Sequence, residues 1–488
     1  MRLLMVVFLS SFWLNGMCCA AEQPPDIVVI LVDDMGYGDP ACFNPGSRIR
    51  TPSINGLARD GMRFTDAHAP GPLCHMSRYG LMTGRYPFRT NVGRWARQPL
   101  INSDQTTLAS MLRSRGYHTA MVGKWHLGFQ EQGYDQDLPG GPVDVGFDSF
   151  FGIRASTDIP PYFYIRDRRA VQPPTKPIGA NASPGWSPIQ GAFWRKGLIA
   201  PDLELEDVLP DLTTEAIRVI QDQAKRNQSR DERQPLFLYL AYPAPHTPWL
   251  PSSEFAGKSD VGMYGDFTTM VDAMVGRVLE AIDATGRKRD TLIVFTSDNG
   301  PVWYEEDVKR LRHDSAGGLR GMKADAWEAG HRMPFIVRWP ARIEAGTQSD
   351  ELVSFVDLMA TFAALTGYRL QTGEGPDSFD FSKVLLGTAK VGEHVRSHLV
   401  INSGAGLMSI RQGQWKLIDG LGSGGFSKPR RLKPGLDEPA QQLYDLGKDR
   451  AESANLASNM SGKVAELKAA MKRIVQSESS RELDWTDR

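Results

Sequence analysis

Cysteine is scarce in this sequence, with four residues in a chain of 488. Cys18 and Cys19 belong to an apolar N-terminal stretch, so the rest of the chain carries only Cys42 and Cys74. In an oxidising compartment these two could form one disulfide. The alternative is a chemical role for Cys74, which lies in "GPLCHMSRYGLMTGR", residues 71–85, between a Gly-Pro turn and a run with helical spacing.

A strong net charge and long apolar runs are lacking as well. The chain has 56 Lys and Arg against 57 Asp and Glu, for a formal net charge of −1. This balance argues against broad electrostatic binding of nucleic acid or of an anionic membrane, so any charge selectivity must be local. Beyond the N-terminus no stretch approaches the roughly 18 consecutive apolar residues of a membrane span. We therefore expect no membrane span in the mature chain.

The N-terminus itself has the pattern of a secretory signal peptide. Arg2 is followed by "LLMVVFLSSFWL" and then by "NGMCCAA", which places small residues before Glu22. A buried first helix is the alternative, but the run has no amphipathic face and leads directly into the polar "EQPPD". The sequence predicts a signal peptide over residues 1–21 and a periplasmic or secreted mature protein.

Short β-branched apolar runs alternate with amphipathic segments along most of the chain. Residues 26–32 and 290–297 are typical of strands buried on both faces, as in a parallel sheet covered by helices. Turn and cap residues bound the helices that we expect between them, which cover residues 51–61, 103–116, 211–226 and 267–286. The alternation predicts an α/β fold with a large, mostly parallel sheet sandwiched by helices.

Two regions depart from this alternation. Residues 154–210 contain Pro, Gly, Trp, Tyr and Arg with little periodicity, so we expect a surface insertion that recognises substrate. The C-terminal part contains short alternating strands and ends in a helix around Val464, Leu467, Met471 and Ile474. The predicted organisation is a catalytic α/β domain over residues 22–390 and a C-terminal subdomain, a small antiparallel sheet with one helix, over residues 391–488.

Polar side chains gather where the predicted strands end. They are Asp33 and Asp34, Asp298 and Asn299, Lys124 and His126, and His246. Open α/β sheets bind ligands beyond the carboxyl ends of their strands, so these distant segments are expected to converge. Three carboxylates and an amide oxygen suit Ca²⁺ or Mg²⁺. The alternative, that each aspartate only caps a turn, is the ordinary interpretation of a single acidic residue.

The residues around Cys74 resemble the signature of the type I sulfatases, the formylglycine-dependent, arylsulfatase-like branch of the alkaline phosphatase superfamily. "CHMSRYGLMTGR" is similar to the family's Cys-x-Pro-Ser-Arg motif and its Leu-Thr-Gly-Arg tail, although Met76 stands where Pro or Ala is usual. Further segments are similar to the family and follow in its order, among them "VVILVDDMGYGD", "GYHTAMVGKWHLG", "FTSDNG" and "GLRGMKADAWEAGHRMPFIVRWP".

The resemblance implies an exported sulfuric ester hydrolase in which a maturation enzyme oxidises Cys74 to formylglycine, whose hydrate is the nucleophile. It implies a Ca²⁺ held by Asp33, Asp34, Asp298 and Asn299, with the residue at position 74 completing the site. It also implies that Arg78 and Lys124 hold the hydrate and that His126 takes a proton. His246 and Lys323 would bind the sulfate and protonate the leaving alcohol, and Ser156 would lie near the sulfate. Cys42 would then remain a free thiol.

The substrate expected from these features is a sulfated polysaccharide or oligosaccharide. Aromatic and arginine side chains of residues 154–210 would contact sugar rings and sulfates, namely Tyr162, Tyr164, Trp186, Trp194, Arg154, Arg166, Arg168, Arg169 and Arg195. Two alternatives stay open. One is a phosphodiesterase or phosphonate hydrolase on the same scaffold, and the other is a non-catalytic binder of sulfated glycans in which Cys74 stays a thiol.

Overall fold

The computed structural model describes residues 23–436 and 438–482. The expected signal peptide over residues 1–21 lies outside these residues. In the described chain no helix has the length and the apolar character needed to cross a bilayer.

A ten-stranded sheet forms the centre of the molecule, in the order β13-β2-β12-β11-β1-β10-β4-β5-β6-β7. Its five middle strands, from β11 to β5, are all parallel, and the flanking pairs are antiparallel except β13 with β2. The bounds are β1 Asp26–Val32, β2 Met62–Phe64, β4 His118–Lys124, β5 Ser149–Ile153, β6 Tyr164–Arg166, β7 Arg169–Ala170, β10 Leu236–Ala241, β11 Thr291–Ser297, β12 Phe335–Arg338 and β13 Thr347–Ser349. The predicted large, mostly parallel sheet is confirmed.

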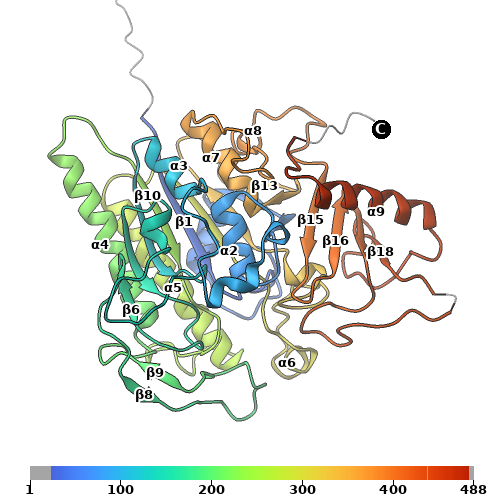
Figure 1. Cartoon of the computed structure of the whole chain (residues 1–488), viewed down its shortest axis with the longest axis horizontal. Coiled ribbons are helices and arrows are strands. Elements are labelled where there is room, and N and C mark those ends of the chain that lie inside the picture. Colours follow the sequence, from blue (N-terminus) through green and yellow to red (C-terminus); the bar gives the residue numbers. More distant parts are fainter. Residues whose placement is uncertain (1–22, 437, 483–488) are drawn as a thin grey trace, which may run out of the picture.

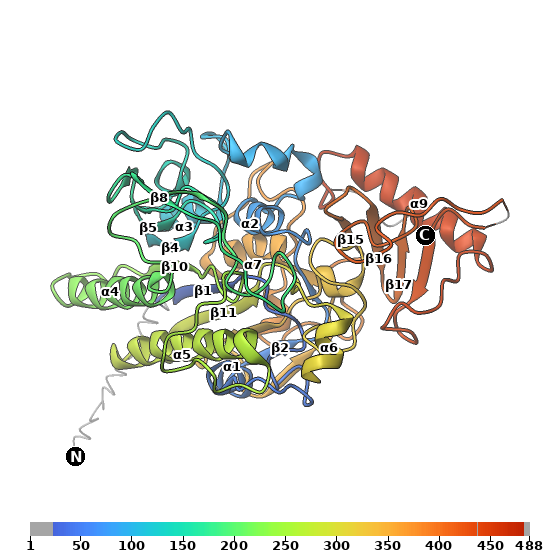
Figure 2. The same ribbon diagram turned by 90° about the horizontal axis from the view of Figure 1, so that it is seen from below.

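Helices cover both faces of this sheet, which is why β1, β10 and β11 are mostly apolar and are buried along their whole length. Helices α1, α4 and α5 pack against one another in one layer, and α2, α3 and α7 in another (Figure 2). Their bounds are α1 Pro52–Arg59, α2 Cys74–Thr83, α3 Leu108–Ser114, α4 Val208–Gln228, α5 Gly262–Ala284 and α7 Leu358–Thr366. The shorter helices are α6 Glu305–Leu311 and α8 Ser382–Leu385.

A small antiparallel sheet lies at one end of the molecule, with α9 along it (Figure 1). Its strands follow in the order β15-β16-β17-β18. They are β15 His398–Asn402, β16 Met408–Gln412, β17 Trp415–Ile418 and β18 Gln442–Asp445, and α9 is Ser461–Gln476. Leu467, Met471 and Ile474 of α9 are buried against this sheet, as their spacing predicts. The expected antiparallel sheet with one helix is confirmed.

The prediction of a surface insertion over residues 154–210 is wrong for the first part of this range. Strand β6 pairs with β5 and so belongs to the main sheet, and Tyr162, Phe163, Tyr164 and Ile165 are buried in the core. Two small strands, β8 Lys176–Ile178 and β9 Gly197–Ile199, form a hairpin in the remainder. Tyr162 and Tyr164 are therefore not available as faces for a sugar ring.

Buried charges join the small sheet to the segment that precedes β12 of the central sheet. The Lys416 ammonium of β17 is fully buried, 3.0 Å from Glu328 Oε1 and 2.9 Å from Glu452 Oε1. Burial, reinforced by the repulsion of Glu328, raises the pKa of Glu452 to about 7 in spite of Lys416. Glu328 also pairs with Arg332 at 3.1 Å and with Arg411 at 3.2 Å, whereas Lys416 is the only ion-pair partner of Glu452 among the described residues. Removal of Lys416 would therefore leave the Glu452 carboxyl group buried without a cation.

We expect Lys416→Met to lower the free energy of unfolding by about 3–5 kcal/mol, the cost of leaving a buried partner charge uncompensated. Denaturant titration followed by circular dichroism measures this loss. Lys448→Met is the matched control, because Lys448 pairs with Asp445 while its side chain is 85% exposed, and such pairs contribute about 0–1 kcal/mol. Equal losses in the two variants would contradict the role given to the buried charges.

Candidate active site

The parallel register brings the predicted polar residues to one edge of the sheet. Val32 pairs with Ser297, so Asp33 and Asp298 follow side by side, and the Asp298 N–H donates to the Val32 carbonyl at 2.9 Å. Lys124 ends β4 opposite Ile153, and the His126 N–H donates to the Arg154 carbonyl at 3.0 Å. The strand order alone therefore places these side chains together.

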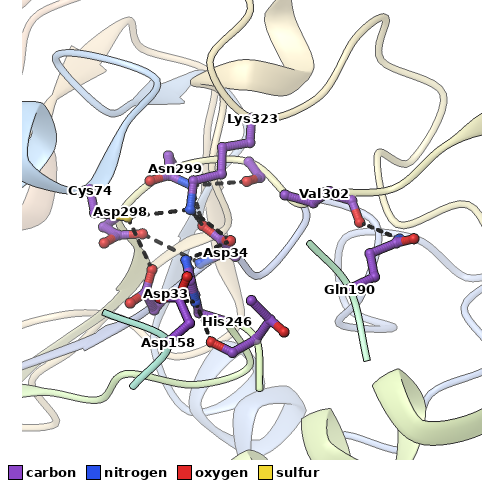
Figure 3. A network of polar contacts seen from close by, with 12 residues as sticks. Asp33, Asp34, Cys74, Asp158, Gln190, His246, Asp298, Asn299, Val302 and Lys323 are labelled. Carbon is purple, nitrogen blue, oxygen red and sulfur yellow. Dashed lines mark hydrogen bonds and ion pairs between the residues drawn. The ribbon is translucent and has the colours of Figure 1, made fainter. Parts of the chain in front are cut away.

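Cys74 is the first residue of α2 and is 4% exposed. Its thiol lies 3.3 Å from Asp33 Oδ1, and the Lys323 ammonium lies 3.4 Å from the sulfur (Figure 3). Burial, together with Asp298 and Asp33, raises the pKa of the Cys74 thiol. Cys42 and Cys74 are both free, so the disulfide alternative is wrong.

Three carboxylates and one amide lie around this thiol, and Asp33, Asp298 and Asn299 are fully buried. Lys323 Nζ lies 2.8 Å from Asp34 Oδ2, Asn299 Nδ2 donates to Asp34 Oδ1 at 2.6 Å, and the Lys124 ammonium pairs with Asp33 Oδ2. Despite burial, Lys124 and His246 hold the pKa of Asp33 well below its usual range. Burial and the repulsion of Asp33 raise the pKa of Asp298 to about 6.

The donor set fits a hard divalent cation. Asn299 Oδ1 is buried and has no hydrogen-bond partner within the described chain, and it belongs to the same cluster as the three carboxylates. Buried oxygens of this kind are normally hydrogen-bonded, so an orphaned amide oxygen indicates a missing partner. Carboxylate and amide oxygens are the ligands of Ca²⁺ and Mg²⁺. A cation would also relieve the repulsion between Asp33 and Asp298.

Arg78 and His126 lie beside the cluster, but only Arg78 is hydrogen-bonded to one of its carboxylates. The Arg78 guanidinium donates to Asp298 Oδ2 at 2.9 Å and to the Lys124 carbonyl at 2.8 Å. His126 is 4% exposed, and neither ring nitrogen has a hydrogen-bond partner in the described part of the chain. Burial and Lys124 lower the pKa of His126 well below its usual value, so its ring is neutral.

His246 and Ser156 come from loops beyond the strand ends. The His246 Nδ1 atom lies 2.6 Å from the Thr247 carbonyl, which can only accept, so Nδ1 is the donor and Nε2 faces Asp34 Oδ2 at 3.6 Å. Ser156 follows β5, is 3% exposed, and its hydroxyl has no hydrogen-bond partner among the described residues. All the residues predicted from the strand ends thus lie at this edge of the sheet.

Three neighbours of the site were missed by the sequence reasoning. Asp158 Oδ1 lies 3.9 Å from His246 Nδ1, and its other oxygen pairs with Arg195. The half-exposed Trp95 meets the His126 ring edge to face at 4.2 Å between centroids, and His75 lies 5.7 Å from the same ring. The place of His75 next to Cys74 is a sequence signal for it, whereas nothing in the sequence marks Trp95.

The arginines expected to bind sulfate groups are paired with acids instead. Arg166 pairs with Glu215 at 2.8 Å, Arg168 with Asp144 at 2.7 Å and Arg169 with Asp137 at 3.4 Å. Arg166 also lies opposite Phe151, and the turn after it contacts Phe150 near the amino end of β5, whereas the site residues follow the carboxyl ends. The expectation that these three arginines recognise substrate is therefore wrong.

Comparison with known proteins identifies relatives over nearly the whole chain. A family model described as "Sulfatase" matches residues 25–368. The chain is 31% identical to an N-acetylgalactosamine-6-O-sulfatase from Bacteroides thetaiotaomicron, covering 93% of each chain. It is 33% identical to human arylsulfatase A, covering 93% of this chain and 88% of the other. A solved B. thetaiotaomicron protein from work on the metabolism of multiple glycosaminoglycans aligns with a TM-score of 0.81 and 29% identity, covering 93% of this chain and all of its own.

Proposed function

Since this chain belongs to the sulfatase family of sulfuric ester hydrolases, we propose that it hydrolyses the sulfate esters of a sulfated polysaccharide or oligosaccharide. In this proposal, catalysis uses a formylglycine formed from Cys74 and a bound Ca²⁺. One observation supports this proposal most directly. The buried Cys74 sulfur lies 3.3 Å from Asp33 Oδ1 and 3.4 Å from Lys323 Nζ, between the oxygen-donor cluster and the Lys323 ammonium. A group at this position can contact a cation and an anionic substrate at once.

Asp33, Asp34, Asp298 and Asn299, with the group at position 74, would hold the Ca²⁺, which offsets negative charge on the sulfuryl oxygens when bound. Formylglycine in place of the thiol supplies a hydrated aldehyde, whose hydroxyl is the nucleophile. The remaining chemistry falls to the side chains around them, and each has a position that suits one role.

Lys124 and Arg78 would orient the group at position 74, because both are fully buried and held by Asp33 and Asp298. His126 would accept a proton, since its ring is neutral and both nitrogens are unpartnered in the described chain. His246 and Lys323 both reach Asp34, so they would lie beside the sulfate oxygens. With its Nδ1 proton donated to Thr247, His246 would pass a proton to the leaving oxygen from Nε2 when the ring carries a second proton there. The unpartnered Ser156 hydroxyl would bind the substrate.

The proposal extends to organisation and location. Residues 22–390 would form the catalytic domain and residues 391–488 the C-terminal subdomain. The pattern of residues 1–21 supports removal of a signal peptide and a periplasmic or secreted enzyme. A formylglycine-generating or sulfatase-maturing enzyme would act on Cys74 before the chain folds, because the thiol is buried afterwards.

Support for a carbohydrate substrate comes from the N-acetylgalactosamine-6-O-sulfatase relative, which matches this chain over 93% of both. We expect matured enzyme to release sulfate from N-acetylgalactosamine 6-sulfate or chondroitin 6-sulfate oligosaccharides with a kcat/KM at least about tenfold above that for nitrophenyl sulfate. One or two additional hydrogen bonds to the sugar suffice for this difference. Ion chromatography of released sulfate measures both rates. Faster turnover of nitrophenyl sulfate, or of a nitrophenyl phosphodiester, than of every sulfated carbohydrate tested would refute the proposal.

A further inference from the structure

A strongly basic loop lies in the C-terminal part of the chain, between β17 and β18. Residues 421–436, here named the basic loop, contain Lys428, Arg430, Arg431 and Lys433 and no acidic residue. All four cations are exposed. This concentration contrasts with the formal net charge of −1 of the whole chain, so the loop is a local cationic surface.

The cations of the basic loop are not neutralised by acids. Within residues 23–436 and 438–482, none of the four forms an ion pair, and Arg431 donates only to the Ala405 carbonyl. The other exposed arginines considered for sulfate binding, such as Arg166 and Arg168, each pair with a carboxylate. An exposed cation without a carboxylate partner is free to bind an external anion, whereas a paired one must first break its ion pair.

The basic loop packs directly against the segment that carries Lys323. The Ala326 N–H donates to the Ser423 carbonyl at 2.7 Å, and the Ser427 N–H donates to Asp325 Oδ1 at 3.1 Å. At Gly425 an added Cβ would lie 2.3 Å from the carbonyl carbon of Ala324, so only glycine permits this approach. The same segment reaches the other side of the site, since the Ala324 N–H donates to the Pro72 carbonyl at 2.8 Å, two residues before Cys74.

Hydrogen bonds within the basic loop set the position of its cations. The Gly424 N–H donates to the Arg430 carbonyl at 2.9 Å, and the Ser423 N–H donates to the Pro429 carbonyl at 3.0 Å. Because Ser423 also accepts from the Ala326 N–H, the backbone at Pro429 and Arg430 is joined to the segment after Lys323 through one intervening backbone segment. The backbone that carries these cations is therefore already positioned before binding, which lowers the cost of ordering the loop.

We propose that the basic loop is an anion-binding subsite for the sugars next to the one whose sulfate ester is cleaved. Lys428, Arg430 and Lys433 bind sulfate or carboxylate groups of those sugars, and the arginine guanidinium can bind such a group through two parallel hydrogen bonds. This inference rests on the proposed carbohydrate substrate. It makes the enzyme selective for a highly charged chain over a single sulfated sugar.

The test removes three charges from the basic loop, as Lys428→Ala, Arg430→Ala and Lys433→Ala together. The kcat/KM for a chondroitin 6-sulfate hexasaccharide, divided by that for N-acetylgalactosamine 6-sulfate, is expected to fall about tenfold, the sum of three exposed charge contacts. The matched control removes three paired arginines at the other end of the strands, as Arg166→Ala, Arg168→Ala and Arg169→Ala, and is expected to leave the ratio unchanged. An unchanged ratio in the basic-loop variant, or an equal fall in the control, would overturn the proposal.

A binding measurement separates this inference from the proposed reaction. In protein that also carries Cys74→Ala, isothermal titration calorimetry with the hexasaccharide is expected to show about tenfold weaker binding when the three cations are removed. This result would stand even if no carbohydrate sulfate were hydrolysed. Equal affinity of the two proteins, or binding of a single-stranded oligonucleotide as tight as that of the hexasaccharide, would contradict a sugar-chain subsite.

Discussion

Replacing Cys74 with alanine is expected to lower kcat on a sulfated carbohydrate by a factor on the order of 10⁴ or more, the loss that removal of a covalent nucleophile causes. The side chain at this position contacts both the oxygen-donor cluster and Lys323, through Asp33 at 3.3 Å and the ammonium at 3.4 Å. No neighbouring hydroxyl or thiol of the described chain makes both contacts. Steady-state kinetics of released sulfate, on protein shown by circular dichroism to be folded, measures the loss.

Cys42→Ala is the matched control for this variant. Cys42 is also a free thiol, but it is half-buried and away from the strand ends, and burial raises its pKa to about 11. We expect its removal to leave kcat and KM unchanged. A Cys74→Ala enzyme with wild-type turnover would refute the assignment of position 74 as the nucleophile, and inactivation by Cys42→Ala alone would point to a different thiol.

Asp298→Asn is expected to abolish binding of the cation and to lower kcat about 10³-fold, because a metal ion stabilises transition-state charge by several kcal/mol. Asp298 is fully buried, and repulsion from Asp33 helps to raise its pKa to about 6. Loss of this charge removes an anionic ligand and leaves the Arg78 guanidinium with only the longer ion pair to Asp33, at 3.6 Å. Metal analysis of the purified protein, together with sulfate release, measures both effects.

The matched control is Asp272→Asn, which changes another buried aspartate. Asp272 accepts hydrogen bonds from the Ser53 and Ile54 N–H groups at 3.0 and 2.8 Å, so it holds the start of α1 and does not reach the site. We expect this variant to lose some stability but to keep one bound cation and its activity. Chelation of wild-type enzyme should reproduce the Asp298→Asn loss, and added Ca²⁺ should restore it. Full activity of metal-free enzyme would rule out a catalytic cation.

The sequence predicts the sheet and the strand-end residues because both depend on short-range patterns. Val28 to Leu31 and their counterparts in β10 and β11 are continuous apolar runs, which only a sheet covered on both faces accommodates. Once these strands are parallel, Asp33, Asp298 and Lys124 must meet at one edge. Helix ends depend on details of capping: the helix expected over residues 103–116 begins only at Leu108, where Thr107 caps it by accepting from the Ser110 N–H.

Contacts between distant segments could not be predicted in this way. The arginines at 166 and 168 look free in the sequence, but Glu215 and Asp144 neutralise them from other elements. Trp95 reaches His126 only because a loop folds over the strand end. The basic loop is visible as a charge run, yet its place against Ala324 depends on Gly425 and on the packing of the small sheet. Each of these features follows from tertiary structure that no local pattern encodes.

The most direct test of the account is tandem mass spectrometry of the peptide that contains Cys74, on active enzyme produced together with a maturation enzyme. The account predicts an aldehyde in place of the thiol at position 74, present in a fraction of molecules equal to the fraction that is catalytically active. It also predicts that protein made without the maturation enzyme has an intact thiol and no turnover. A fully active preparation in which Cys74 is an unmodified thiol would contradict the account.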